Sequence, residues 1–143
     1  KSAIIDQTYQ TNVRGIFLCG NALQIHDLVD NVTEESRRAG KAIGRFLNEE
    51  QINRELINVL TNDMITYITP QRINLNSPVD NVFLSFRSRK KMEKAILKIY
   101  QSDQLIIEKK MTFVRPAEME TFQFSIDQLI NDEDLSVVVE ERK

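Results

Sequence analysis

A glycine and an asparagine, Gly20 and Asn21, stand where an apolar run ends and an amphipathic segment begins. A residue without a Cβ atom lets a ligand approach the backbone closely, and a helix N-terminus facing the same space stabilises negative charge. This arrangement suits the electron-rich edge of a ligand. Gly-Asn pairs are also common in tight turns, so the pair has a purely structural interpretation as well.

His26 is the only histidine, and it lies close in sequence to Asp27 and Asp30. Histidine changes charge near neutral pH, which suits proton transfer beside a cofactor; a capping or packing role is the alternative. A metal site needs at least three protein ligands, and only carboxylates are near His26 in the sequence. We therefore expect no metal site.

The remaining reactive or charged side chains have structural interpretations. Cys19 lies inside an apolar run, so we expect it to pack as a small hydrophobic residue without a redox role. Four charged residues of the second half alternate along predicted strands, and such residues usually line a solvent face rather than a catalytic site. They are Arg87, Arg89, Glu118 and Glu120.

Residues 11–28, TNVRGIFLCGNALQIHDL, resemble the last conserved segment of the flavoproteins that include thioredoxin reductase and other FAD/NAD(P)-dependent pyridine nucleotide-disulfide oxidoreductases. In that family the pattern T-x-V-x-G-[IV]-[FY]-x-x-G-[DN] precedes a helix. The resemblance covers the first 47 residues. Asn21 replaces the usual aspartate, and residues 24–30 look closer to a branch that has an HDLVD-like segment and an added C-terminal β domain.

The resemblance implies a set of FAD contacts. Asn21 would bind the ribityl chain, the amides around residues 25–28 would face the pyrimidine end of the flavin, and the helix dipole would stabilise reduced flavin. In the intact enzyme, FAD would pass electrons between NAD(P)H and an unknown acceptor. The GxGxxG turns that hold dinucleotide pyrophosphates do not occur here, so we expect this chain alone to bind no FAD and to be inactive. The implied cofactor-binding residues are Gly20, Asn21, His26, Asp27 and Leu28.

Two elements would position these residues. Residues 13–20 form a continuous apolar run of the length expected for a strand buried on both faces of a parallel sheet. From about His26 to Asn48, apolar residues recur at helical spacing and predict a long amphipathic helix. Either Asp27 or Thr33 could cap a helical segment, and we expect a break near Asn31.

Polar residues 48–53 predict a connection and a domain boundary. Beyond them apolar residues alternate, which indicates half-buried strands, and Ser102-Asp103 predicts a hairpin turn. The predicted fold class is α+β: residues 1–50 are the strand-helix remnant of an FAD-binding α/β domain, and residues 51–143 are an antiparallel immunoglobulin-like β-sandwich. The predicted strands are 57–60, 65–69, 82–86, 95–101, 105–113, 122–126 and 135–140.

Composition limits the partners. The 143 residues include 19 basic and 21 acidic side chains, a net charge of −2 that gives no field to attract nucleic acid or anionic lipid. No apolar run reaches the roughly 20 residues that span a bilayer, and the single cysteine suits a reducing compartment, so we expect a cytoplasmic protein. The chain begins at Lys1 rather than Met, which suggests a piece of a longer protein.

A second hypothesis belongs to another functional class. The chain could instead be a non-catalytic interaction module whose helix and sandwich bind a partner protein. The two hypotheses differ for the first 48 residues, because a strand and helix cut from their domain would leave apolar surface exposed. Homo-oligomers formed through this segment would support the first hypothesis.

Overall fold

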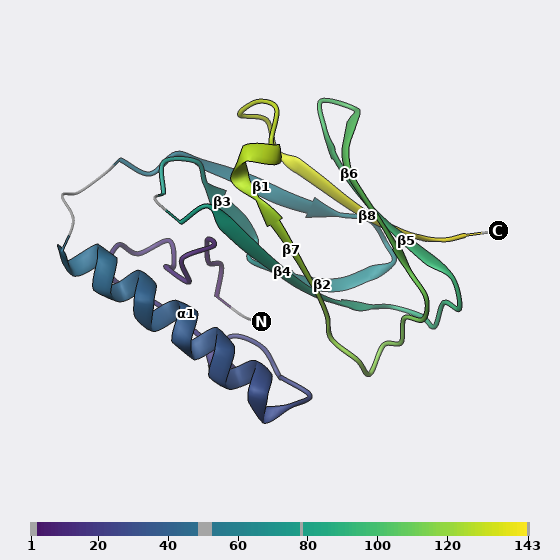
Figure 1. Cartoon of the computed structure of the whole chain (residues 1–143), viewed down its shortest axis with the longest axis horizontal. Coiled ribbons are helices and arrows are strands. Elements are labelled where there is room, and N and C mark those ends of the chain that lie inside the picture. Colours follow the sequence, from purple (N-terminus) through teal and green to yellow (C-terminus); the bar gives the residue numbers. More distant parts are fainter. Residues whose placement is uncertain (1–2, 49–52, 78, 143) are drawn as a thin grey trace.

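The computed structural model describes residues 3–48, 53–77 and 79–142. It is an α+β structure with one N-terminal helix followed by two β-sheets that share a core (Figure 1). The segment before the helix lies between the helix and the sheets. Most of the predicted connection, residues 49–52, lies outside the described residues.

The helix α1, Val29–Asn48, is continuous. The predicted break near Asn31 is wrong, because Asp30 and Asn31 lie in the first helical turn, where an acidic side chain is favoured by the helix dipole. Thr33 does not cap a second segment; its Oγ1 donates a hydrogen bond to the Val29 carbonyl 3.2 Å away. The polar residues therefore mark the beginning of the helix.

Residues 13–20 do not form the predicted buried strand. Their backbone makes only an isolated bridge, Gln10 to Phe17, and the side chains of Val13 and Ile16 are about half exposed (52% and 53%). Gly15 has φ = +81° and donates its N–H to Gln10 Oε1 at 2.9 Å, so the chain turns where a strand would continue. A strand is stable only beside neighbouring strands, and none of the described strands pairs with this run.

The N-terminal segment packs against α1 through a small apolar cluster of its own. Ile5, Tyr9 and Leu23 bury their side chains against Ala39 of the helix. Near the other end of the helix, the rings of Phe17 and Phe46 meet edge to face, with centroids 5.5 Å apart. These contacts hold the segment in place although it has little regular structure.

The strands confirm the predicted alternation over most of the second half. All seven predicted strands are present with ends within two residues of the prediction; the predicted strand 105–113 extends two residues past the observed end at Met111. A short strand, β3, was not predicted. The strands are β1 Leu56–Thr61, β2 Ile65–Thr69, β3 Arg72–Asn74, β4 Asn81–Ser88, β5 Ala95–Gln101, β6 Gln104–Met111, β7 Glu120–Ser125 and β8 Leu135–Glu141.

The two sheets have the orders β3-β1-β8-β5-β6 and β2-β4-β7. The prediction of a wholly antiparallel arrangement is wrong in one place, because β1 and β8 pair in parallel, with Val59 opposite Leu135. The predicted hairpin is confirmed between β5 and β6: Ser102 and Asp103 both have positive φ, as the tightest hairpin turns require. The larger sheet is therefore mixed and the smaller one antiparallel.

The core lies between the sheets and is made by alternate residues of the strands. In β4, Val82, Leu84 and Phe86 are at most 1% exposed, and Leu97 and Ile99 of β5 meet them from the other sheet. Burial of such side chains is the main stabilising contribution to folding. None of the described helices is long and apolar enough to cross a membrane.

Candidate functional site

Gly20 adopts the conformation that its position requires. Its φ is +66°, which favours glycine, and its carbonyl accepts hydrogen bonds from the N–H groups of Leu23 and Gln24, both at 3.0 Å, around the 3-10 turn Gly20–Ala22. A Cβ atom here would meet only Val32 Cγ1, at an ordinary 3.8 Å. The positive φ, rather than crowding, is therefore the reason for glycine in this structure.

Glu35 is the centre of a buried polar network beside Gly20. Its side chain comes from the second turn of α1 and is 2% exposed. Oε1 accepts a hydrogen bond from the Gly20 N–H at 2.7 Å, and Oε2 accepts one from Gln24 Nε2 at 2.8 Å. Gln24 Oε1 in turn accepts from Thr69 Oγ1 at 3.1 Å, which connects the network to β2.

His26 points into this network rather than toward solvent. Its Nε2 lies 2.8 Å from Glu35 Oε2, and its side chain is also 2% exposed. These two atoms are close enough for an ion pair, but they are not aligned for a hydrogen bond. The other ring nitrogen, Nδ1, has no hydrogen-bond partner among the described residues. The imidazole is thus buried in a polar interior, where proton transfer to an external ligand would require it to move.

Asp27 links the segment before α1 to the three-stranded sheet. Its Oδ2 accepts a hydrogen bond from the Met119 N–H and its Oδ1 one from Arg87 Nη2, both at 2.7 Å. The Met119 N–H lowers the pKa of the Asp27 carboxyl below its usual value, and the Arg87 guanidinium adds to this effect. The carboxylate is therefore held in its charged form and bound to residues at this sheet.

Arg87 differs from the prediction that it lines a solvent face. Its side chain is only 16% exposed, and it donates to Tyr67 Oη (3.1 Å) and to the carbonyls of Ile25 (2.9 Å) and Ala117 (2.6 Å). Burial acts to lower the Arg87 pKa, but the hydrogen bonds to Asp27 and Tyr67 outweigh this effect and raise the pKa above its usual value. Arg87 is buried because the segment before α1 covers this part of β4. The alternation of charges along one strand cannot predict such a tertiary contact.

The other three alternating charges stay nearer the surface. Arg89 is exposed and donates through Nε to the Asp63 carbonyl at 2.8 Å. Glu118 is exposed, 3.8 Å from Arg115. Glu120 is half-buried, and burial together with the nearby Glu118 charge raises the pKa of its carboxyl. No catalytic arrangement of carboxylates is evident from these contacts.

Asn21 and Leu28 are exposed, and the polypeptide around them offers unpaired donors. Among the described residues, the Asn21 side chain has no hydrogen-bond partner, and the N–H groups of residues 25–28 donate no hydrogen bond. These are the groups that the resemblance places against FAD. In contrast, the imidazole of His26 and the carboxylate of Asp27, which the resemblance also assigns to the cofactor site, are directed toward Glu35 and Arg87.

Glu35 and Gln24 are the polar residues that the sequence analysis did not single out. Glu35 precedes Ala39 by four residues and Ala42 by seven. That spacing places all three on one helical face, and all three are buried. A carboxylate on an apolar helical face was thus a signal that could have identified the network.

Cys19 is half-buried, and with Leu18 it packs against the apolar cluster of the N-terminal segment. Its Sγ is 3.9 Å from Ser36 Oγ. In the described part of the chain, no three side chains of the His, Cys, Asp or Glu type gather closely enough to hold a metal ion. No protein-family model, curated protein or solved structure matches the chain.

Proposed function

We propose that the chain is the C-terminal part of an FAD-dependent pyridine nucleotide oxidoreductase, in which residues 20–28 contact the flavin. The carrying observation is that the segment with the flavoprotein-like sequence presents the free Asn21 side chain and four consecutive unpaired N–H groups within the described structure. Donors of this kind hydrogen-bond the polar edge of a flavin and stabilise negative charge on it. FAD would carry electrons between NAD(P)H and an unidentified acceptor.

The distribution of exposed apolar side chains supports a larger domain around this segment. Of the eleven large apolar side chains that are exposed among the described residues, eight come from residues 3–48 and three from the sandwich. Exposed apolar surface of this extent usually marks a contact region. The eight are Ile4, Val13, Ile16, Ile25, Leu28, Val29, Ile43 and Leu47.

In this proposal the two sheets form an immunoglobulin-like sandwich attached to the flavin domain. Two sheets around a common core agree with that architecture, and the parallel β1–β8 pair departs from a purely antiparallel one. The sandwich would hold the flavin segment through the Asp27–Arg87 pair and the Gln24–Thr69 hydrogen bond. The role of the sandwich would be to position the flavin segment. Docking to another subunit is a further option.

The second candidate function is a non-catalytic interaction module. One observation favours it: the segment, α1 and the sandwich are joined by buried polar contacts, among them the Gln7 side chain, which exchanges two 2.8 Å hydrogen bonds with the Asn74 backbone. Arg54 also binds Asp6 at 3.0 Å and the Thr11 carbonyl at 2.9 Å. A unit connected in this way could act by itself, with the exposed apolar surface as its partner site.

The visible absorbance spectrum separates the two functions. The 143-residue chain and the product of the complete reading frame that contains it are purified in parallel and compared. The oxidoreductase proposal predicts a flavin spectrum in the longer protein, and bleaching of that spectrum by NADH or NADPH under anaerobic conditions. A colourless longer protein, or a reading frame no longer than this chain, would support the interaction module instead.

A further inference from the structure

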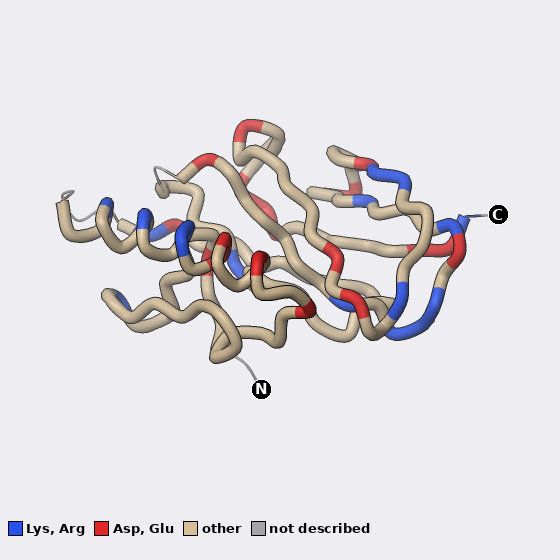
Figure 2. The backbone as a smooth tube through the Cα atoms, turned by 60° about the horizontal axis from the view of Figure 1, so that its bottom comes forward, with Lys and Arg blue, Asp and Glu red and all other residues tan. Residues whose placement is uncertain are grey.

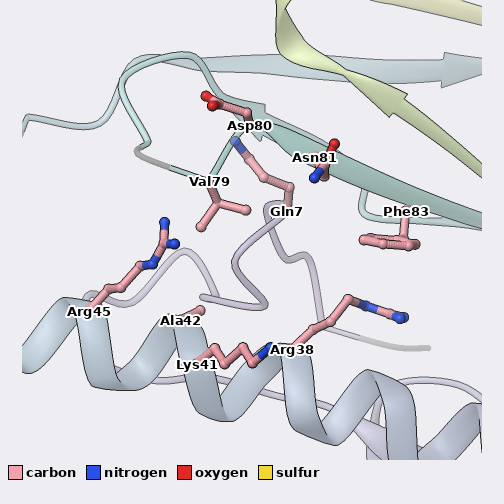
Figure 3. Close-up of a pocket in the computed structure, with 9 residues that line it drawn as sticks. All are labelled: Gln7, Arg38, Lys41, Ala42, Arg45, Val79, Asp80, Asn81 and Phe83. Carbon is pink, nitrogen blue, oxygen red and sulfur yellow. The ribbon is translucent and has the colours of Figure 1, made fainter.

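A pocket of about 260 Å³ lies between α1 and the beginning of β4 (Figure 3). Its floor is apolar, with Ala42 from the helix and Val79 and Phe83 from the other side. Its volume is slightly below the range typical of small-molecule sites, so it would hold a compact ligand rather than a dinucleotide.

Three basic side chains of α1 line one wall of this pocket. Arg38, Lys41 and Arg45 are spaced by three and four residues, so they lie on the same face of the helix. Figure 2 shows that the basic residues of α1 follow its acidic ones toward the C-terminal end. The opposite wall contributes a single carboxylate, Asp80, which forms no ion pair within the described part of the chain.

Arg38 is held in a fixed orientation that leaves part of its guanidinium available. Its Nε donates to Tyr9 Oη at 3.0 Å, and its Cζ lies 4.0 Å from the centroid of the Phe83 ring. Neither Nη1 nor Nη2 makes a hydrogen bond to the described residues. A guanidinium fixed in this way presents two parallel donors, which match the oxygen atoms of a phosphate or carboxylate.

Lys41 adds an exposed positive charge to the pocket lining. Its side chain is exposed, and its ammonium has no hydrogen-bond or ion-pair partner among the described residues. In Figure 3 it extends along the helix toward Arg38. Two positive side chains, Arg38 and Lys41, match an anion with more than one charge and therefore favour a phosphate over a single carboxylate.

We infer that this pocket binds a small organic phosphate ester, with the phosphate held by Arg38 and Lys41 and the organic group against Phe83 and Val79. The site is separate from residues 20–28 and does not depend on the proposed flavin chemistry. The amide of Gln7 does not take part, because both of its polar atoms are bonded to the Asn74 backbone.

The test is a titration of the isotope-labelled 143-residue chain followed by two-dimensional ¹H–¹⁵N NMR. The probes are inorganic phosphate and phenyl phosphate. We expect saturable shifts of the amide signals of Ala42, Asn81 and Phe83, and tighter binding of phenyl phosphate because its ring covers apolar surface. Equal or weaker binding of phenyl phosphate would overturn the assignment to an organic ester and assign the pocket to free phosphate.

Two variants that remove the same charge from α1 localise the site. Lys41→Gln is expected to weaken phenyl phosphate binding about tenfold, the effect of losing one charge-assisted hydrogen bond. Arg37→Gln is the matched control, because Arg37 is exposed and pairs with Glu34 outside the pocket. Equal weakening by both variants, or no saturable shift at millimolar phosphate in the wild type, would overturn the proposal.

Discussion

His26 Nε2 lies 2.8 Å from Glu35 Oε2, and both side chains are almost completely buried. This pair joins the end of the segment before α1 to the second helical turn, and Gln24 extends the connection to β2. The residues proposed to contact FAD are therefore positioned by a polar interior and not by a strand. The free energy of that network is open to measurement.

Replacement of Glu35 by alanine should lower the free energy of unfolding by about 2–4 kcal/mol, because it leaves the buried N–H of Gly20 and the amide of Gln24 without acceptors. Urea unfolding followed by circular dichroism measures the change. Glu34→Ala is the control, since Glu34 is exposed and pairs with Arg37 alone among the described residues, and it should change stability by less than about 0.5 kcal/mol. Similar losses in the two variants would contradict a buried network.

The Asp27 carboxylate should stabilise the fold only above the acidic range. Its folded-state pKa lies below the ordinary 3.8, so its contribution is complete above that value and is lost as the pH falls through the lower folded-state pKa. Asp27→Asn should therefore be less stable than the wild type at neutral pH, and the difference should shrink well below pH 3.8. Urea unfolding at both pH values measures it.

The pKa shift of Glu120 is opposite in direction to that of Asp27, so the two carboxyls should affect stability in opposite ways. Burial raises its folded-state pKa above the ordinary 4.5, so the stability linked to its protonated form is lost as the pH rises through the folded-state value. Glu120→Gln should be more stable than the wild type at neutral pH and equal to it in acid. The same sign of change for Asp27→Asn and Glu120→Gln at neutral pH would refute these assignments.

Gly20 should not tolerate a side chain, because its φ of +66° is unfavourable for other residues. Gly20→Ala is expected to lower the free energy of unfolding by about 1 kcal/mol. Gly40→Ala is the matched substitution within α1, where an added Cβ meets nothing within 4 Å. It should raise stability by about 0.5–1 kcal/mol, so thermal unfolding of the two variants should shift in opposite directions. A shift in the same direction would contradict the assigned backbone roles.

Self-association of the chain should depend on the apolar surface of the first 48 residues. Leu28 and Val29 are 63% and 80% exposed, and the double substitution of both by serine should shift any dimer toward monomer in sedimentation velocity. Leu60→Ser, at a half-exposed position in β1, is the control and should leave the distribution unchanged. A monomeric wild type at all concentrations would count against an exposed interface on this segment.

The strands of the two sheets could be predicted because each has one buried face, which imposes an alternating sequence. Val82, Leu84 and Phe86 illustrate this relation, since all three are buried in β4. The strand β3 could not be predicted, because it has three residues and only Ile73 among them is apolar. The parallel pairing of β1 with β8 could not be predicted either. An alternating sequence indicates which face of a strand is buried, but it does not indicate which strand lies beside it.

The N-terminal segment shows where the sequence argument fails. An apolar run such as residues 13–20 has the composition of a buried strand, but its conformation depends on neighbouring strands that the described chain does not supply. Of the candidate site, Gly20 could be predicted as a turn residue from its type. The inward orientation of His26 could not, because it depends on a partner nine residues away whose burial was not recognised.

Asn21 and the amides near it are proposed to contact FAD in a larger protein. The most direct measurement is the dissociation constant for FAD of the complete reading-frame product, compared among the wild type, Asn21→Ala and Asn58→Ala. Asn58 is an exposed asparagine of β1, in the sandwich, and serves as the matched control. The account predicts about tenfold weaker FAD binding for Asn21→Ala, the effect of one lost hydrogen bond, and no change for Asn58→Ala. Equal FAD affinity in all three proteins, or no FAD binding by the wild type, would contradict the claim.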